Sequence, residues 1–327
     1  MQAPGTDLLL GAMDCHVHAC PHLNARSLDV FEAVREAAAA GMAGIGLMDN
    51  FANSSGLAAL ARRQLPECAI DVFGGLIMEP PAGGISAEAV RVALAYGYGA
   101  GAGARFISLP THHTRHVAIQ EGRSTLYCET CFAAPESGPL PDPVPEILDL
   151  VAEAAVVFNT GHVSETEALR LVEQARRQGI GRILVPASLY GAEAVRALVG
   201  AGAMVEFSFF FVSHATQVGL THVDAEAHRI AGTTATQLAT LIRAAGADHS
   251  VLSSDCGVAL LPRPVEGLRE FLLLLEATGI EPSALRTMVN DNPIRLFQTP
   301  VCLPSANALT AFPLNSARKT DNEEDYN

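Results

Sequence analysis

The chain has 327 residues, of which 49% are hydrophobic, 17% are charged and 6% are aromatic. Its net charge of −14 argues against a nucleic-acid surface, because contacts with phosphates need clustered Lys and Arg. The apolar fraction excludes a disordered chain, and no apolar run approaches the roughly 18–20 residues that span a bilayer, so no membrane contact is expected. The N-terminus has no signal-peptide pattern, so we expect a cytoplasmic protein with reduced cysteines.

Short β-type runs alternate along the chain with helical runs rich in Ala and Leu. Strict alternation implies βαβ units, and eight of them at this length predict an α/β fold, a single-domain (β/α)8 TIM-like barrel. A doubly wound open sheet is the alternative, but its glycine-rich turn is missing after the first strand. The predicted strands are 11–18, 44–48, 70–78, 106–109, 156–160, 183–185, 204–209 and 251–254. The predicted helices are 29–40, 56–63, 87–96, 146–153, 165–178, 192–201, 234–245 and 265–278.

We expect the barrel to occupy residues 1–297 and a polar C-terminal tail to occupy 298–327. Two long loops interrupt the alternation, at 117–145 after the fourth strand and at 210–233 after the seventh. A barrel would place both loops on the face where the strands end, which is where active sites lie. The first loop contains Cys128 and Cys131, which we interpret as loop cysteines because a zinc site needs two further ligands.

The strongest chemical feature is the run Asp14-Cys15-His16-Val17-His18 at the end of the first strand. Residues i and i+2 of a strand point to the same side, so His16 and His18 form a pincer for a divalent metal. Asp14 would share that side and orient a ligand or its neighbours. The alternative is a coincidental pair of histidines.

Two further candidate ligands follow later strands. His162 comes after Gly161, which allows a close approach of backbone or ligand, although His162 could instead be a helix-entry residue beside the N-cap Ser164 and Glu167. Asp255 follows the eighth strand and could bind metal through one oxygen and take a proton from water through the other. The alternative for Asp255 is a cap of the following loop.

This pattern resembles the amidohydrolase superfamily of metal-dependent barrel hydrolases, and more particularly an uncharacterised bacterial branch of it. The resemblance covers roughly residues 12–297 and rests on the histidine pair, the later His and Asp, and three short runs, namely Pro110-Thr111, Thr160 to Glu167 and Asn292 to Phe297. It implies a distorted (β/α)8 barrel, one or two divalent metals, and hydrolysis of an amide, ester or related bond. Some relatives decarboxylate or deaminate instead, so the fold does not fix the reaction.

Departures from that resemblance reduce the number of metal ions that we expect at the site. Many relatives bridge two metals with a carboxylated lysine, but the first lysine of this chain is Lys319. No histidine follows the sixth strand, and Glu79, a substitute bridge in principle, is interpreted as a rim-exposed residue. We therefore expect one metal, Zn²⁺ or alternatively Mn²⁺, held by His16, His18, His162 and Asp255 or a subset of them.

Other side chains are candidates for catalysis or substrate binding. His112 and His116 follow the fourth strand and could donate to a substrate oxygen, bind metal or simply occupy a polar loop. Arg26 and Arg115 could clamp a substrate carboxylate, and His214 could reach the site from the loop after the seventh strand, with solvated surface positions as the alternatives.

The sequence thus predicts a metal-dependent hydrolase in which Asp255 takes a proton from a metal-activated water that attacks a small-molecule substrate. A metal-dependent decarboxylase of a small carboxylic acid uses the same ligands and is one alternative. A degenerate barrel that binds without catalysis is another. The chain could also form a homo-oligomer, as barrels of this type commonly do.

Overall fold

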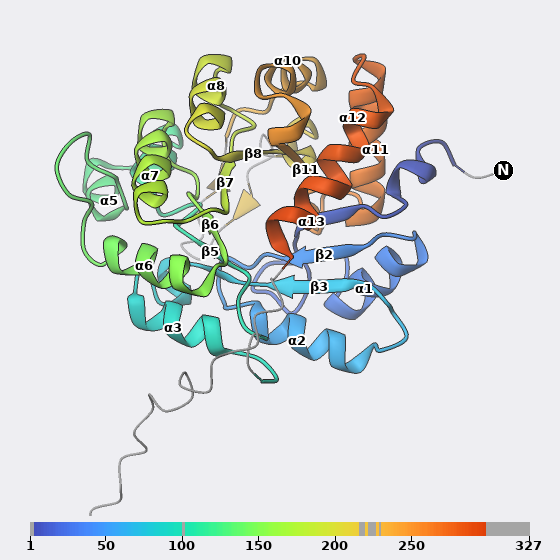
Figure 1. Ribbon diagram of the computed structural model, residues 1–327, viewed down its shortest axis with the longest axis horizontal. Helices are drawn as coiled ribbons and strands as arrows, with labels where there is room; N and C mark the ends of the chain where they lie inside the picture. Colours follow the sequence, from blue (N-terminus) through green and yellow to red (C-terminus); the bar gives the residue numbers. More distant parts are fainter. Residues whose placement is uncertain (1–2, 100–101, 216–219, 222–226, 229, 299–327) are drawn as a thin grey trace, which may run out of the picture.

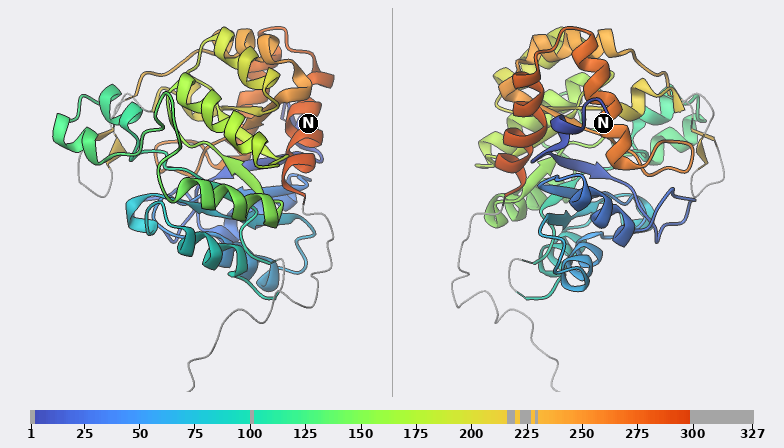
Figure 2. Two further views of the ribbon diagram at one scale, coloured as in Figure 1. Left: turned by 60° about the vertical axis from the view of Figure 1, so that its left-hand side comes forward. Right: turned by 90° about the vertical axis from the view of Figure 1, so that its right-hand side faces the viewer.

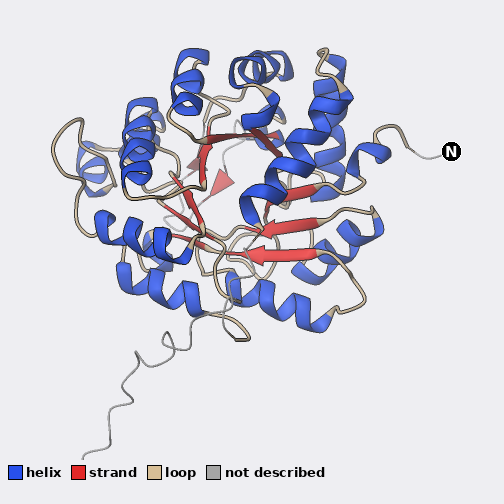
Figure 3. Cartoon of the chain, viewed as in Figure 1, coloured by secondary structure: helices blue, strands red, loops and turns tan. Residues whose placement is uncertain are grey.

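The computed structural model describes residues 3–99, 102–215, 220–221, 227–228 and 230–298. Parallel strands lie at the centre and helices surround them (Figures 1 and 3). This arrangement is the predicted α/β barrel. Apart from Gln298, the predicted tail lies outside the described residues.

The barrel strands belong to two parallel sheets, β1–β2–β3 and β4–β5–β6–β7–β8–β11. Only Gly75 separates β3 from β4, so one predicted strand contributes to both sheets. Almost every strand residue is buried, as expected of parallel strands covered on both faces. The bounds are β1 (Met13–Val17), β2 (Gly44–Leu47), β3 (Asp71–Gly74), β4 (Leu76–Ile77), β5 (Phe106–Ser108), β6 (Val157–Asn159), β7 (Ile183–Pro186), β8 (Met204–Ser208) and β11 (Ser250–Ser253).

The first and last strands meet along a short seam rather than a full ladder. Val17 forms an isolated parallel bridge with Cys256. The His18 N–H donates to Cys256 O (2.8 Å), and the Asp255 N–H donates to His16 O (2.9 Å). The seam thus joins the ring of strands at the position where both candidate ligand segments leave the sheet.

The predicted helices form close to their expected bounds, and side chains cap the N-termini of α1, α3, α7 and α10. Ser164 and Glu167 form a reciprocal capping box, as do Thr234 and Gln237. None of the described helices is long and apolar enough to cross a membrane. The helices packed around the barrel are α1 (Val30–Ala39), α2 (Ser55–Gln64), α3 (Ala87–Ala95), α6 (Val144–Ala154), α7 (Glu165–Arg177), α8 (Ala192–Gly200), α10 (Ala235–Ala245) and α11 (Pro264–Ala277).

The two segments expected to be long loops contain regular structure, which corrects that prediction. The first holds α4 (Arg115–Gln120) and α5 (Thr125–Thr130), so Cys128 is helical rather than in a loop. Thr114 and Ser124 cap these short helices by accepting backbone N–H groups, a local signal that the Pro- and Gly-rich composition obscured. The second segment holds α9 (Phe209–Val212) and the antiparallel pair β9 (Leu220–Thr221) and β10 (Ala227–His228).

Further short elements lie near both ends of the described chain and in two connections between strands and helices. Figure 2 shows α4 and α5 projecting from one side of the body, with the last helices on the opposite side. These elements are η1 (Thr6–Leu9), η2 (Pro80–Ala82), η4 (Ala247–His249), α12 (Pro282–Arg286), the π-helical turn η5 (Thr287–Asp291) and α13 (Asn292–Phe297).

A plug of apolar side chains fills the barrel at the end where its strands begin. Inward residues such as Phe106 and Leu184 belong to this cluster. Phe297 of α13 enters it and stacks on Phe73, with ring centroids 4.6 Å apart. Because this end is filled, a cavity can form only where the strands end.

Gly257 follows the seam directly, and a substitution there can test how closely the two strands approach each other. A Cβ there would lie 1.6 Å from His18 O, and the φ of Gly257 is +118°. We predict that Gly257→Ala lowers the free energy of unfolding by more than about 3 kcal/mol, measured by urea denaturation.

The matched control is Gly179→Ala, where φ is also positive (+85°) but no atom lies within 4 Å of the added Cβ. Its cost should be only the conformational penalty of about 1–2 kcal/mol. Equal losses in the two variants would contradict the close approach at the seam.

Candidate active site

Three proposed metal ligands lie where the first and last strands end. His16 is in β1 and His18 follows that strand, while Asp255 lies two residues after β11. Asp255 has φ of 51°, in the left-handed region that Asp tolerates better than most residues. This backbone conformation and the seam together direct the carboxylate toward both imidazoles.

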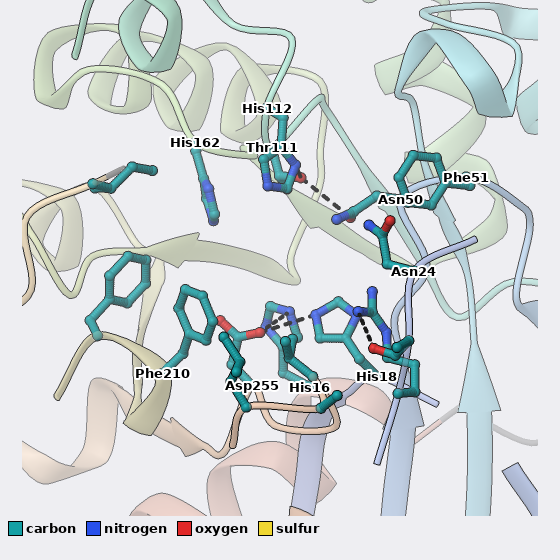
Figure 4. Close-up of a pocket in the computed structure, with 17 residues that line it drawn as sticks. His16, His18, Asn24, Asn50, Phe51, Thr111, His112, His162, Phe210 and Asp255 are labelled. Atoms are coloured by element: carbon teal, nitrogen blue, oxygen red, sulfur yellow. Dashed lines mark hydrogen bonds and ion pairs between the residues drawn. The ribbon is translucent and has the colours of Figure 1, made fainter. Parts of the chain in front are cut away.

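The ligand atoms of these residues converge (Figure 4). Asp255 Oδ1 lies 3.0 Å from His18 Nε2 and 3.3 Å from His16 Nε2. In the described part of the chain these three residues form the group whose ligand atoms all lie within 4.8 Å of one another. Tetrahedral bonds of about 2.0–2.2 Å to a metal hold ligand atoms about 3.3–3.6 Å apart, so the observed spacing is close to what a divalent ion requires.

Two carboxylates flank His16, one at each ring nitrogen. Its Nδ1 lies 2.9 Å from Glu206 Oε1, and its Nε2 faces Asp255. Burial lowers the pKa of His16, but Asp255 and Glu206 outweigh it and raise this pKa to about 9. The two carboxylates thus favour a positive charge at His16, and a divalent cation could take the place of the proton on Nε2.

His18 and Asp255 have the protonation states that metal ligands need. Burial lowers the pKa of His18 to about 4, so its imidazole is neutral near pH 7. For Asp255, burial raises the pKa, but His16, His18 and His162 outweigh it and the net shift is downward. The carboxyl group is consequently ionised.

Glu206 is a site residue that the sequence reasoning missed. It lies in β8, is 2% exposed, and its Oε1 accepts hydrogen bonds from Ser253 Oγ (2.6 Å) and His16 Nδ1. Accepting from Nδ1 leaves His16 Nε2 facing the candidate metal position, the orientation found in carboxylate–histidine–metal arrangements. A lone acidic residue within the apolar strand 204–208 was the signal that could have identified it.

Asp14 acts on the backbone next to the site. Its Oδ1 accepts the Ser254 N–H (3.0 Å) and the His16 N–H (3.3 Å). The pairing of β1 with β2 shifts register between Asp14 and Val17, so strict alternation does not describe the whole strand. Asp14 thus helps to hold the two ligand segments together.

His162 lines the same cavity but does not join the close group of ligand atoms in the described structure. Figure 4 shows its ring pointing toward Asp255 and His16 from the opposite wall. Gly161 has φ of +67°, and a Cβ there would lie 2.1 Å from Pro110 O, which is the close approach expected from the sequence. Burial lowers the pKa of His162 to about 4.

Glu79 corrects another expectation, because it is 4% exposed rather than on the open rim. Its Oε1 accepts the N–H groups of Thr111 and His112 (both 2.6 Å), and its Oε2 accepts the His113 N–H (3.2 Å). These bonds shape the turn after β5 that brings Thr111 and His112 to the cavity. Buried backbone donors explain the burial that sequence pattern alone could not show.

Three predicted site residues lie away from this cavity. His116 lines a smaller pocket beyond His162, and its Nε2 lies 3.1 Å from Gln120 Nε2. Arg115 is exposed on α4, and its Nε donates to Cys128 O (3.4 Å). His214 is exposed with φ of 57°. Of the predicted substrate-binding residues, Arg26 is the one that lines the cavity.

The cavity has a volume of about 260 Å³, slightly below the range typical of small-molecule sites. Figure 4 shows Asn24, Asn50 and Phe51 on one side and Phe210 on the other, with the three candidate ligands below. One wall is therefore polar and another apolar. The apolar lining includes Phe210, Phe211, Ile230, Val258 and Leu260.

Comparison with protein families gives one match. The model of the family described as "Family of unknown function (DUF6282)" matches residues 11–206. This range contains His16, His18, His162 and Glu206, but not Asp255. A comparison with curated proteins finds no match.

Solved structures show the same fold at low sequence identity. An amidohydrolase from Pseudomonas aeruginosa is 11% identical, with a TM-score of 0.54 and coverage of 90% of this chain and 98% of that one. An organophosphorus hydrolase from Deinococcus radiodurans is 17% identical, with a TM-score of 0.54 and coverage of 88% and 93%. A mutant of a PTE-like lactonase from Deinococcus radiodurans is 17% identical, with a TM-score of 0.54 and coverage of 91% of this chain and 98% of that one. These likenesses confirm the predicted barrel fold.

The hydrogen bonds to Glu79 predict a pH-dependent contribution to stability. Burial raises the pKa of Glu79, but hydrogen bonds from His112 and Thr111 outweigh it and lower this pKa to about 2. A lowered carboxyl pKa stabilises the fold above the unfolded pKa of about 4.3, and this contribution is lost as the pH falls toward 2. We predict that Glu79→Gln destabilises the protein by about 2–3 kcal/mol at pH 7.

Between pH 7 and pH 4 the difference in unfolding free energy between wild type and Glu79→Gln should shrink by about 0.6 kcal/mol. Urea denaturation at several pH values measures it, with the exposed Glu276→Gln as control. A difference that is independent of pH would contradict the assigned role of Glu79.

Proposed function

The chain belongs to the family of unknown function DUF6282, and we propose that it is a metal-dependent hydrolase of a small molecule. The observation that carries the proposal is the convergence of His16, His18 and Asp255 at the floor of a cavity where the strands end. The similar structures are described as an amidohydrolase, an organophosphorus hydrolase and a lactonase, which supports hydrolysis over other reactions of this fold. The proposed bond is an amide, ester or cyclic amide bond.

The donor set fits a single divalent cation. Two imidazole nitrogens and one carboxylate oxygen form a three-ligand set of the kind found in catalytic zinc sites, and Mn²⁺ is the alternative ion. His18 Nδ1 is buried and has no hydrogen-bond partner among the residues that the structure describes, while its Nε2 faces Asp255. When bound, the ion would lower the pKa of a water molecule toward about 7 and polarise the substrate carbonyl.

Asp255 would accept a proton during the reaction, and His112 would donate a hydrogen bond. Asp255 Oδ1 faces both histidines, so Oδ2 is the oxygen that would accept a proton from the attacking water. His112 lines the opposite wall, and its Nδ1 lies 3.0 Å from Thr111 Oγ1. Its Nε2 would then donate to the oxygen on which negative charge develops.

The test combines metal analysis with turnover. Purified protein is expected to contain close to one zinc or manganese per chain and to hydrolyse members of a panel of small lactones, esters and cyclic amides. His18→Ala and Asp255→Ala should each reduce kcat/KM by at least about 10³-fold, because each removes a ligand.

His249→Ala is the matched control, because His249 is exposed in η4, where β11 begins. Its kcat/KM and metal content should equal those of wild type. Full turnover in both ligand variants, or failure to hydrolyse any member of the panel with metal present, would overturn the proposed function.

Glu206 gives a second test that does not depend on turnover. Glu206→Gln keeps the size of the side chain but removes the negative charge beside His16 Nδ1. We predict that zinc affinity, measured by competition with a chromogenic chelator, falls by about 10–100-fold.

The exposed Glu153→Gln is the control for the loss of one negative charge. Equal zinc affinities in the two variants would mean that Glu206 does not support the metal ligand.

A further inference from the structure

Arg26 is a cation on the wall of a cavity in a strongly acidic protein. It lies in the segment between β1 and α1 and lines the cavity together with His16, His18 and Asp255. The whole chain carries a net charge of −14, so a guanidinium in this position is not part of a general basic surface. An arginine keeps its charge throughout the physiological pH range, so the cavity wall is permanently cationic here.

The Arg26 guanidinium makes few hydrogen bonds for a partly buried group. Its Nη2 lies 2.7 Å from His22 Nε2, and its Nη1 lies 3.5 Å from Ala25 O. Its Nε is buried and has no hydrogen-bond partner within the described part of the chain. Among the described residues, no carboxylate oxygen lies within 4.0 Å of the Arg26 guanidinium, so Arg26 forms no ion pair there. A guanidinium has five N–H donors, so most of its capacity is unused.

Asp49 is a source of compensating charge near Arg26, and His22 Nε2 lies close to both side chains. Asp49 Oδ1 lies 3.7 Å from His22 Nε2 and accepts the N–H groups of Phe51 (2.7 Å) and Ala52 (3.2 Å). These hydrogen bonds hold the carboxylate against the backbone of its own loop. Asp49 lines a separate groove rather than the cavity, so it leaves the cavity side of Arg26 available.

The backbone holds Arg26 in a fixed position relative to the catalytic end of the barrel. Arg26 forms an antiparallel bridge with Val258, three residues after Asp255. The neighbouring Ser27 N–H donates to Gly257 O (2.8 Å). The segment that carries the cation is therefore tied to the segment that carries the proposed base, which is the preorganisation that a substrate clamp requires.

We propose that Arg26 is a carboxylate-binding subsite, so that the substrate is a small acid with a hydrolysable amide, ester or lactone bond. The proposal rests on the function proposed above and names its substrate class. The planar fork of one arginine matches the two oxygens of a carboxylate, whereas a phosphate dianion usually recruits several donors and cations. The amide-bearing Asn24 and Asn50 also line the cavity and lie together on one side of it, as Figure 4 shows.

The apolar wall opposite limits the rest of the substrate. Phe210 and Phe211 would contact an uncharged carbon chain or ring, and about 260 Å³ admits only a small molecule. In the reaction, water adds across the acyl C–O or C–N bond: its oxygen joins the acyl carbon, and a proton goes to the departing oxygen or nitrogen. The carboxylate on Arg26 takes no part in the bond changes and serves only to orient the substrate.

A binding experiment tests the subsite independently of catalysis. Glutarate and its diamide, glutaramide, are titrated calorimetrically into zinc-loaded protein and into protein stripped of metal. We expect one glutarate per chain, at least 10-fold weaker binding of glutaramide, and at least 10-fold weaker glutarate binding in Arg26→Gln. Arg115→Gln, which removes an exposed arginine outside the cavity, should bind glutarate as wild type does. Arg26→Lys, which keeps the charge but not the fork, should bind with intermediate affinity and guards against misfolding of the Gln variant.

A kinetic experiment with matched substrates separates this proposal from the hydrolase proposal. Monomethyl glutarate and its neutral carboxamide analogue differ in the remote group but not in the ester. Wild type should prefer the acid by at least 100-fold in kcat/KM, and Arg26→Gln should lose that preference while retaining its metal. Glutarate binding that depends on Arg26 without any hydrolysis would support the subsite and overturn the hydrolase. Hydrolysis without preference for the acid, or phosphate binding more tightly than glutarate, would overturn the carboxylate subsite.

Discussion

The candidate site depends on the contact between the first and last strands of the barrel. Asp255 donates its N–H to His16 O, and His18 donates its N–H to Cys256 O. Asp14 accepts the Ser254 N–H across the same contact, and burial raises the pKa of its carboxyl to about 7. Gly257 allows the two backbones to approach where a side chain would collide. The contact that completes the ring of strands is therefore also the one that assembles the proposed ligands.

Charge balance at His16 connects this contact with the chemistry. The imidazole lies between Glu206 and Asp255, so each of its two nitrogens contacts a different carboxylate. A buried pair of carboxylates needs a compensating positive charge, and either a proton or a metal ion can provide it. Glu206 fixes which nitrogen faces the shared position, and Ser253 in turn donates to Glu206. The site is thus supported by a layer of polar side chains that lies between the ligands and the apolar plug of the barrel.

The sequence predicted the fold and the floor of the site because both follow from local pattern. Short β-type runs that alternate with helical runs located the strands. His16, His18 and Asp255 lie at strand ends that a barrel must bring to one face. Residues whose roles depend on long-range contacts were not predictable in this way. Glu79 is buried because backbone N–H groups from the 111–113 turn surround it, and Glu206 matters because a strand from the other end of the chain lies beside it. The positions of Arg115 and His116 were misjudged because two short capped helices occupy a segment that composition alone suggested was a loop.

The seam also has a consequence for the order in which the molecule is completed. Asp14 and Ser254 are separated by 240 positions, so their hydrogen bond closes almost the whole barrel. Contacts between residues so distant in sequence form late, because the entropy of closing the chain is recovered only when they are made. During synthesis from the N-terminus, His16 and His18 leave the ribosome long before the aspartate that completes their set. The proposed ligand set is therefore incomplete until nearly all of the barrel has been synthesised, because Asp255 lies 237 positions after His18.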